Sequence, residues 1–144
     1  MKISNILDTK GRTVHTVVPW TTVKDAIGVL NEHRVGALVA CEARHKICGI
    51  LSERDIVRGL GRHGGALLAM KIDEVMTHRV ATCAPDGTVA KAMAQMTRGR
   101  YRHLPVVERG EMIGLVSIGD LVNHRVKEME LEAGVLRDVV IARY

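Results

Sequence analysis

Two stretches of the chain repeat apolar residues with the period of an amphipathic helix. In each stretch the apolar positions fall at i, i+3, i+4 and i+7, which places them on one face of a helix of about three turns. The two sets are Val23, Ala26, Ile27 and Leu30, which follow Thr22, and Val89, Ala92, Met93 and Met96, which follow Thr88. The pattern therefore predicts one helix with a buried face in each half of the chain.

Short apolar runs come after each predicted helix. Residues 35–41 (VGALVAC) and 46–52 (KICGILS) follow the first helix, and residues 102–107 (RHLPVV) and 111–117 (EMIGLVS) follow the second. These runs are rich in Val, Ile and Leu and are separated by the polar residues 42–45 and 108–110, so each pair is typical of two paired strands. A second helix begins directly after each pair, at residues 53 and 118.

The two halves are copies of one unit. Residues 16–41 align without a gap with residues 82–107, which pairs Pro19 with Pro85 and Leu38 with Leu104. Upstream, residues 2–7 (KISNIL) resemble residues 71–76 (KIDEVM). Downstream, the pattern Gly-x-x-Ser-x-x-Asp occurs at residues 49–55 (GILSERD) and again at residues 114–120 (GLVSIGD). The chain is a tandem duplication, and such internal repeats determine the fold.

Each copy is expected to run strand, helix, strand, strand, helix. One copy has too little surface to form a core alone, so we expect a mixed α/β (α+β) fold in which two β-α-β-β-α repeats pack with pseudo-twofold symmetry. Gly61, Gly64 and Gly65 mark the crossover between the copies. The predicted divisions are residues 1–65 for the first copy with the N-terminal segment, 66–126 for the second copy, and 127–144 for a C-terminal amphipathic helix.

The predicted C-terminal helix carries a narrow apolar seam. From Val126 the residues Met129, Ala133, Leu136 and Val140 are spaced alternately three and four apart, beside the charged stretch KEMELE. Two interpretations stay open, because two heptads are too few to decide between them. The helix either folds back on its own domain or pairs with a second subunit.

Composition narrows the class of protein. The 144 residues are 47% hydrophobic, enough for a buried interior, and lack an apolar run of the roughly 18 residues that a membrane span needs. With no signal peptide evident, we expect a cytoplasmic protein. Three cysteines without a C-x-x-C pair, and histidines without metal-ligand spacing, give no reason to expect a disulfide framework or a metal site. The formal net charge of +5 suits nucleic acid, an anionic membrane or a phosphorylated ligand equally.

The repeated serine and aspartate have a structural and a functional interpretation. A serine at the first position of a helix and an acid three residues later form a capping box, a common device that needs no ligand. The same helix start presents free amides to a phosphate, and its carboxylate can accept both hydrogens of a ribose diol. The two interpretations are compatible, and duplication favours binding because two equivalent clefts would form between the copies.

The order of these motifs resembles a known family. V-G-A-L-V at 35–39, G-I-L-S-E-R-D-I-V at 49–57, Y-R-H-L-P-V-V at 101–107 and G-L-V-S-I-G-D-L-V at 114–122 are similar to a tandem pair of cystathionine β-synthase (CBS) domains, as found in small free-standing bacterial proteins. The resemblance covers residues 2–126. It implies a non-catalytic Bateman module, often a homodimer, that binds AMP, ADP, ATP, NAD(H) or S-adenosylmethionine between the repeats and reports adenylate or redox state to a regulated protein partner.

The resemblance also implies a set of nucleotide-binding residues. Asp55 and Asp120 would accept ribose hydroxyls, Ser52 and Ser117 would contact phosphate, and the strand starts would line the adenine. Arg102 and His103 stand where the first copy has Gly-Ala, so the cationic reach toward phosphate would come mainly from one strand, supplemented by Arg54, and the two clefts should bind unequally. Gly119 leaves space where Arg54 stands in the other copy. The full set is Val35, Gly36, Ala37, Ser52, Arg54, Asp55, Tyr101, Arg102, His103, Ser117, Gly119 and Asp120.

Several residues near these positions also have simpler explanations. His103, taken without its neighbours, would be a satisfied strand histidine. Lys10, Arg12, His78 and Arg79 precede the first strands and either approach a ligand's phosphates or are solvated loop cations, the second being favoured.

Two other functions compete with a nucleotide sensor. A nucleic-acid binder needs a one-sided basic stripe with stacking aromatics, but aromatic content is 2% and charges of both signs are mixed along the chain. A nucleotide-converting enzyme needs an activated nucleophile or an open metal site, and the sequence pattern contains neither. Both alternatives are weaker than the sensor.

Overall fold

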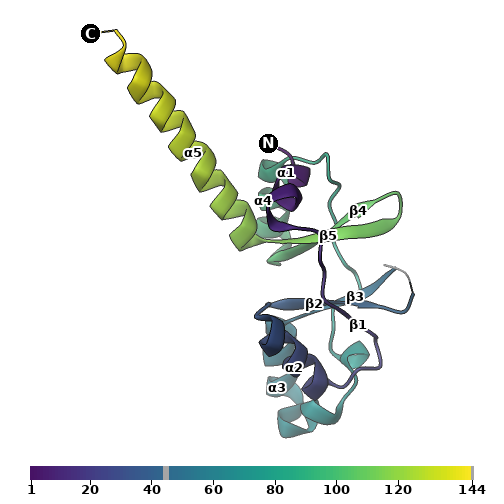
Figure 1. Ribbon diagram of the computed structural model, residues 1–144. Helices are drawn as coiled ribbons and strands as arrows, with labels where there is room; N and C mark the ends of the chain where they lie inside the picture. Colours follow the sequence, from purple (N-terminus) through teal and green to yellow (C-terminus); the bar gives the residue numbers. More distant parts are fainter. Residues whose placement is uncertain (44–45, 144) are drawn as a thin grey trace.

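The computed structural model describes residues 1–43 and 46–143 and contains two α/β halves (Figure 1). The lower half in the figure holds β1 (Thr16–Val17), α2 (Val23–His33), β2 (Ala37–Cys41), β3 (Ile47–Ser52), α3 (Glu53–His63) and the short helices η1 (Gly64–Ala69) and η2 (Ile72–Glu74). The upper half holds α1 (Ile3–Lys10), α4 (Val89–Gly99), β4 (His103–Glu108), β5 (Glu111–Ser117) and the start of α5 (Ile118–Ile141). The predicted mixed α/β fold of two similar repeats is confirmed.

The two sheets match closely but are not identical. In the first half β1 pairs in parallel with β2, and β2 pairs antiparallel with β3, so that Ala37 lies opposite Ser52. In the second half β4 pairs antiparallel with β5, and His103 lies opposite Ser117. The predicted opening strand of the second copy is reduced to one parallel bridge, between Cys83 and Val106. Arg44 and His45, in the predicted polar connection between β2 and β3, lie outside the described residues, as does Tyr144.

Helices α2 and α4 begin and end through the same local interactions. Each starts after a threonine whose side chain accepts a hydrogen bond from the amide three residues on, Thr22 for α2 and Thr88 for α4, both at 3.2 Å. Each ends at an arginine in the left-handed conformation, Arg34 with φ 52° and Arg100 with φ 56°. The chain therefore turns toward β2 and β4 at equivalent points.

The segments that precede the two copies exchange halves. Residues 2–7 pack in the second half, whereas the similar residues 71–76 pack in the first, and the backbone hydrogen bonds that hold them correspond in pairs. The pairs are Ile3 N to Gly87 O (2.9 Å) with Ile72 N to Thr21 O (2.8 Å), and Val89 N to Met1 O (3.1 Å) with Val23 N to Met70 O (2.9 Å). Each hydrogen bond made by one exchanged segment therefore has an equivalent in the other, which is the expected pseudo-twofold symmetry. The predicted division placed residues 1–65 in the first copy, whereas α1, which belongs to that range, packs in the second half.

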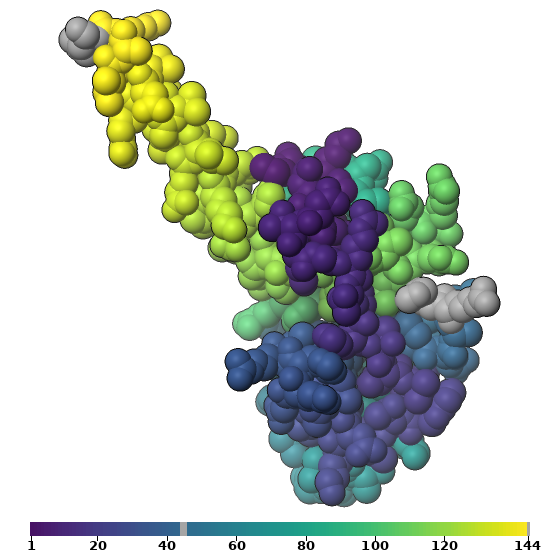
Figure 2. All heavy atoms as spheres, in the orientation of Figure 1, coloured from purple at the N-terminus to yellow at the C-terminus, as the bar shows by residue number. Residues whose placement is uncertain are grey.

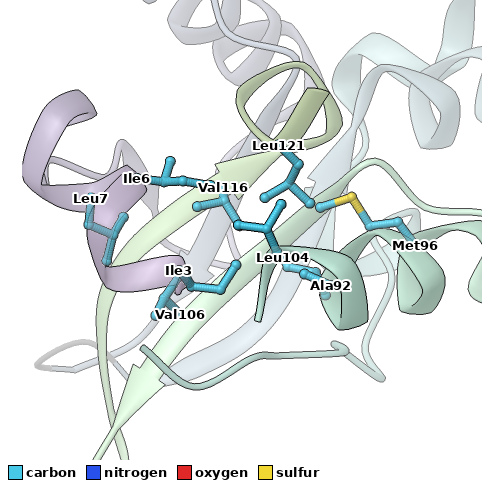
Figure 3. Packing of buried hydrophobic residues seen from close by; sticks show 10 residues of the cluster. Ile3, Ile6, Leu7, Ala92, Met96, Leu104, Val106, Val116 and Leu121 are labelled. Atoms are coloured by element: carbon cyan, nitrogen blue, oxygen red, sulfur yellow. The ribbon is translucent and has the colours of Figure 1, made fainter. Parts of the chain in front are cut away.

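Each half has its own apolar core, and the exchanged segment completes it. In the second half Ile3 and Ile6 of α1 and Met96 of α4 lie on either side of Leu104 and Val116 (Figure 3). In the first half the 3-10 helices supply equivalent contacts through Leu67 and Ile72, both 0% exposed. Because each core depends on a segment that lies next to the other copy in sequence, the two halves are expected to fold as one unit.

The glycines of the repeated pattern are explained by this exchange. A Cβ added to Gly114 would lie 2.7 Å from Cδ2 of Leu7, and a Cβ added to Gly49 would lie 2.6 Å from Sδ of Met76. Leu7 and Met76 are equivalent residues at the ends of the two exchanged segments. The glycine of each Gly-x-x-Ser-x-x-Asp pattern therefore provides the space in which the neighbouring side chain packs.

Helix α5 continues without a break across the predicted boundary at residues 126 and 127 and projects away from both halves (Figure 1). The first alternative for this helix, folding back on its own domain, is wrong, because Val126, Met129 and Leu136 remain 47%, 54% and 66% exposed. The few apolar contacts of α5 come from its first turn, where Leu121 is buried. Within residues 1–43 and 46–143, no helix is long and apolar enough to cross a membrane.

Candidate functional site

A cavity of about 600 Å³ lies at the junction of the two halves. Its walls come from the end of β3 and the first turns of α3, from the segment that leads toward α4, and from the turn between α4 and β4. Both copies therefore contribute to one site. The lining residues are 36, 50, 52–55, 57–58, 77, 79–81 and 99–103.

Ser52 and Asp55 form a capping box at the start of α3, beside this cavity. The Asp55 amide donates to Ser52 Oγ at 3.3 Å, and the Ser52 amide and hydroxyl donate to Asp55 Oδ2 at 3.0 and 3.1 Å. Thr77 Oγ1 donates to Asp55 Oδ1 at 3.2 Å. The structural interpretation of the serine and aspartate is thus confirmed. Asp55 is only 8% exposed, yet Oδ1 has one donor and can accept a second hydrogen bond.

Ser117 and Asp120 form the same box at the start of α5, but a cation is bound to it. Ser117 N donates to Asp120 Oδ2 at 2.8 Å, and Asp120 N donates to Ser117 Oγ at 3.2 Å. Lys10 Nζ donates to Asp120 Oδ2 at 2.5 Å and to Leu115 O at 2.8 Å. The favoured interpretation of Lys10 as a solvated loop cation is therefore wrong, because the exchange of segments brings α1 to this carboxylate. Arg12 is exposed, with Asp8 at 3.7 Å.

The pair with Lys10 affects the ionisation of Asp120. Burial alone would raise the pKa of this carboxyl, but the hydrogen bond and charge of Lys10 and the Ser117 amide hold the pKa below its ordinary value. Asp120 is therefore ionised at neutral pH and already paired. The two equivalent aspartates differ in this respect, since the donors to Asp55 are neutral.

The turn between α4 and β4 brings residues of the second copy to the first. Arg54 donates from its guanidinium to the carbonyl oxygen of Arg100 at 2.7 Å. A Cβ added to Gly36 would lie 3.3 Å from the His103 ring, so these two predicted residues, one from each copy, are in contact. His103 thus lies at the junction of the copies, and its ring would have to shift by a few tenths of an ångström to accommodate a side chain at position 36.

The predicted site residues divide into two groups. Seven of them line the cavity together: Gly36, Ser52, Arg54, Asp55, Tyr101, Arg102 and His103. The other five, Val35, Ala37, Ser117, Gly119 and Asp120, are not among its lining residues. Ala37 is buried in β2, opposite Ser52.

Several lining residues were not predicted as site residues. Arg58 lies one turn after Arg54 on α3, a spacing that helical periodicity could have revealed. Arg100 is the residue at which α4 ends, so the predicted end of that helix could have identified it. Thr77, in contrast, reaches Asp55 only because the segment after η2 crosses to β3. Arg79, favoured as a solvated cation, also lines the cavity. Five arginines and only two acids therefore surround it, which favours an anionic ligand.

His103 should make stability depend on pH. Burial lowers the pKa of its imidazole, with Lys10 adding to the effect, so the folded state keeps this ring neutral. Below about pH 6.5 the unfolded chain binds a proton that the folded chain resists, and the free energy of unfolding is expected to fall as pH falls. Urea unfolding at about pH 7.5 and about pH 5.5 measures this loss. It should be smaller in His103→Gln, and an equal loss in both proteins would contradict the assignment.

No group of three or more His, Cys, Asp or Glu side chains placed to hold a metal occurs in the described part of the chain. The thiol of Cys83, which is bridged to Val106 of β4, is kept protonated because burial raises its pKa to about 11.

Comparison with known proteins identifies the family. The CBS domain model matches residues 10–62 and again residues 72–127. A mitochondrial CBS domain-containing protein of Arabidopsis thaliana is 36% identical over 134 residues, covering 88% of this chain and 65% of the relative, so the chain spans just under two thirds of that protein's length. A CBS domain-containing protein of Bacillus subtilis is 30% identical over 122 residues, covering 83% of this chain and 84% of the relative.

Solved structures agree with this assignment. A CBS-domain containing protein from Agrobacterium tumefaciens has a TM-score of 0.85 and 39% identity, covering 87% of this chain and 99% of that one. A protein with CBS domains from Burkholderia ambifaria has a TM-score of 0.83 and 37% identity, covering 88% and 95%. Because the two family matches fall on the two copies of the duplicated unit, this chain belongs to the CBS domain family, as a tandem pair of CBS domains.

Proposed function

We propose that this chain is a non-catalytic regulatory module that binds an adenosine-containing ligand, such as AMP, ADP, ATP or NAD(H), in the cavity between its two copies. The observation that carries the proposal is the buried Asp55 carboxylate at a helix start, inside a cavity lined by five arginines. A CBS domain pair of the same fold, with a TM-score of 0.79 and 22% identity, was solved in complex with 5′-methylthioadenosine and S-adenosyl-L-methionine. That precedent supports the ligand class.

Each part of the nucleotide has a chemical counterpart in the cavity. Asp55 Oδ1 would accept a ribose hydroxyl, because it has one donor at present. The first turn of α3 directs the positive end of a helix dipole toward a phosphate, and Arg58 and Arg79 add charge. The purine would lie against the α4–β4 turn, beside the His103 ring, which occupies the space next to Gly36. These roles assign the recognition of sugar and phosphate to different elements of the cavity.

The two carboxylates would not serve equally. At Asp120, Lys10 Nζ donates a charge-assisted hydrogen bond to Oδ2 and offsets the charge of the carboxylate, so a ribose hydroxyl at Oδ1 would be held less strongly than at Asp55. We propose that the Asp55 cavity is the higher-affinity site and that the Asp120 cleft binds weakly. This extends the expectation that the copies bind unequally, and it names Lys10 as the cause.

Regulation requires that the ligand distinguish two states of the module. A ligand that binds both states with equal affinity shifts no population, whatever its affinity. Because the cavity walls come from both copies, an occupied cavity would hold the halves in one relative position, and a protein partner could bind that state selectively. We propose that the module acts in the cytoplasm, as a homodimer, and reports adenylate or redox state in this way.

Ligand retention and thermal stability test the proposal. Mass spectrometry of the purified protein should detect a bound adenosyl compound, and a thermal-shift panel of AMP, ATP, NAD, NADH and S-adenosylmethionine should show saturable stabilisation. A ligand at 100 times its dissociation constant adds about 2.7 kcal/mol. The absence of stabilisation by every member of the panel would refute the proposal. Turnover of ATP or NAD would show an enzyme, and steep salt-dependent DNA binding would show a nucleic-acid binder.

A further inference from the structure

Helix α5 presents a continuous apolar seam that nothing in the described chain covers. The seam residues recur at spacings of four and three along 24 residues, a length of about 36 Å. Figure 2 shows the helix standing clear of the body, with its surface open along most of its length. The members of the seam are Val122 (43% exposed), Val126 (47%), Met129 (54%), Ala133 (exposed), Leu136 (66%) and Val140 (57%).

The seam has the residue types of a two-stranded parallel coiled coil. In heptad notation Val126, Ala133 and Val140 occupy a positions, and Val122, Met129 and Leu136 occupy d positions. β-branched residues at a and leucine at d favour two parallel strands, because the geometry of each layer suits those side-chain shapes. This preference is followed by Val126 and Val140 at a positions. It is also followed at d by Leu136 and by Met129, which like leucine is unbranched at Cβ.

The charges beside the seam determine its orientation. In a parallel pair, each g residue faces the e residue five positions later on the other helix. Arg125 would face Glu130 of the other copy, and Glu132 would face Arg137, so symmetry produces four pairs of opposite charge. Arg125 now bonds Glu128 of its own helix at 3.0 Å and would exchange or share this partner. An antiparallel pair that overlaps the whole seam would instead bring Glu130 beside Glu130, and Glu132 beside Glu132.

We propose that α5 forms a parallel two-stranded coiled coil with α5 of a second copy of this chain. The interface is isologous and closes on itself, so it produces a dimer and not a filament. Parallel pairing places both bodies at the same end of the coil, where α5 leaves β5. The proposal specifies the homodimer named above, but it does not involve the ligand cavity, and its failure would leave nucleotide binding untouched.

A disulfide between the two helices tests both pairing and orientation. Ala133 occupies an a position, so in a parallel coil the two copies of this residue face each other. Full-length Ala133→Cys is expected to form a disulfide between the two substituted positions on mild oxidation, identified by peptide mass spectrometry so that the native cysteines are not confused with it. In the antiparallel arrangement residue 133 would face Met129, and the link would be absent. Light scattering of the wild-type chain should give twice 15.8 kDa.

Two matched substitutions show whether the seam is responsible. Leu136→Glu places a charge in the seam, whereas Leu131→Glu places the same charge at an f position of the same helix, where the leucine is similarly exposed (70% against 66%). Added to Ala133→Cys, the first change should lower the yield of the disulfide at least roughly tenfold, since burying an unpaired charge costs more than about 1.4 kcal/mol. The second should leave it unchanged. A monomeric wild-type chain, no disulfide in Ala133→Cys, or equal yields in both variants would overturn the proposal.

Discussion

Replacing Leu7 with alanine is expected to lower the free energy of unfolding by about 2–5 kcal/mol. Leu7 is 1% exposed, and its Cδ2 occupies the space that Gly114 leaves open in β5. The substitution removes buried methyl groups and leaves a cavity that the surrounding strand and helix can only partly close. Equilibrium unfolding in urea, followed by circular dichroism, measures the loss.

The control for this prediction is Leu68→Ala. Leu68 belongs to η1 and is 42% exposed, so the same chemical change should cost less than about 1 kcal/mol. Met76→Ala, at the equivalent end of the other exchanged segment, should behave like Leu7→Ala, because Met76 is 6% exposed and packs on Gly49. If Leu7→Ala were as mild as Leu68→Ala, α1 would not be part of the second core.

Replacing Asp55 with alanine is expected to weaken adenylate binding roughly 100-fold. A hydrogen bond to a charged acceptor contributes about 1.5–3 kcal/mol, and the bond from a ribose hydroxyl to Asp55 Oδ1 would be lost; the upper part of that range corresponds to roughly 100-fold. Isothermal titration calorimetry of AMP, or of whichever panel member stabilises the protein most, measures the affinity. The same experiment gives the number of ligands bound per chain.

Asp120→Ala is the matched control, because it removes the same type of capping box. Each substitution should destabilise its helix start by about 1 kcal/mol, so a difference in affinity between them cannot come from lost capping. With Lys10 bound to Asp120 in the structure, Asp120→Ala should retain the affinity of the Asp55 cavity. Equal losses in the two variants, or full affinity in Asp55→Ala, would remove the proposed role of Asp55.

The elements of this fold depend on interactions that a short window of sequence contains. The starts of α2 and α4 follow from the side chains of Thr22 and Thr88, which accept bonds from amides three residues away. The capping boxes at Ser52 and Ser117 are equally local. Apolar periodicity predicted both buried helical faces, and the duplication predicted the symmetry of the two halves. Even the seam of α5 was evident from its spacing.

Contacts between distant segments required the tertiary structure. Lys10 and Asp120 are 110 residues apart, and no local pattern relates them; they meet because α1 crosses to the second half. The exchange of segments also brings Leu7 to Gly114 and Met76 to Gly49. These contacts explain the glycine of the Gly-x-x-Ser-x-x-Asp pattern, whereas its serine and aspartate were explained by the sequence.

By itself, therefore, the sequence determined the repeat, the order of its elements and the paired serine and aspartate, because hydrogen bonds and apolar periods within a few turns of chain decide these features. Only the tertiary structure decided which half each upstream segment completes, which aspartate carries a lysine, and that the seam of α5 remains exposed. Those outcomes depend on how the two halves and their exchanged segments pack together, and the free energy of that packing is distributed over residues far apart in the chain.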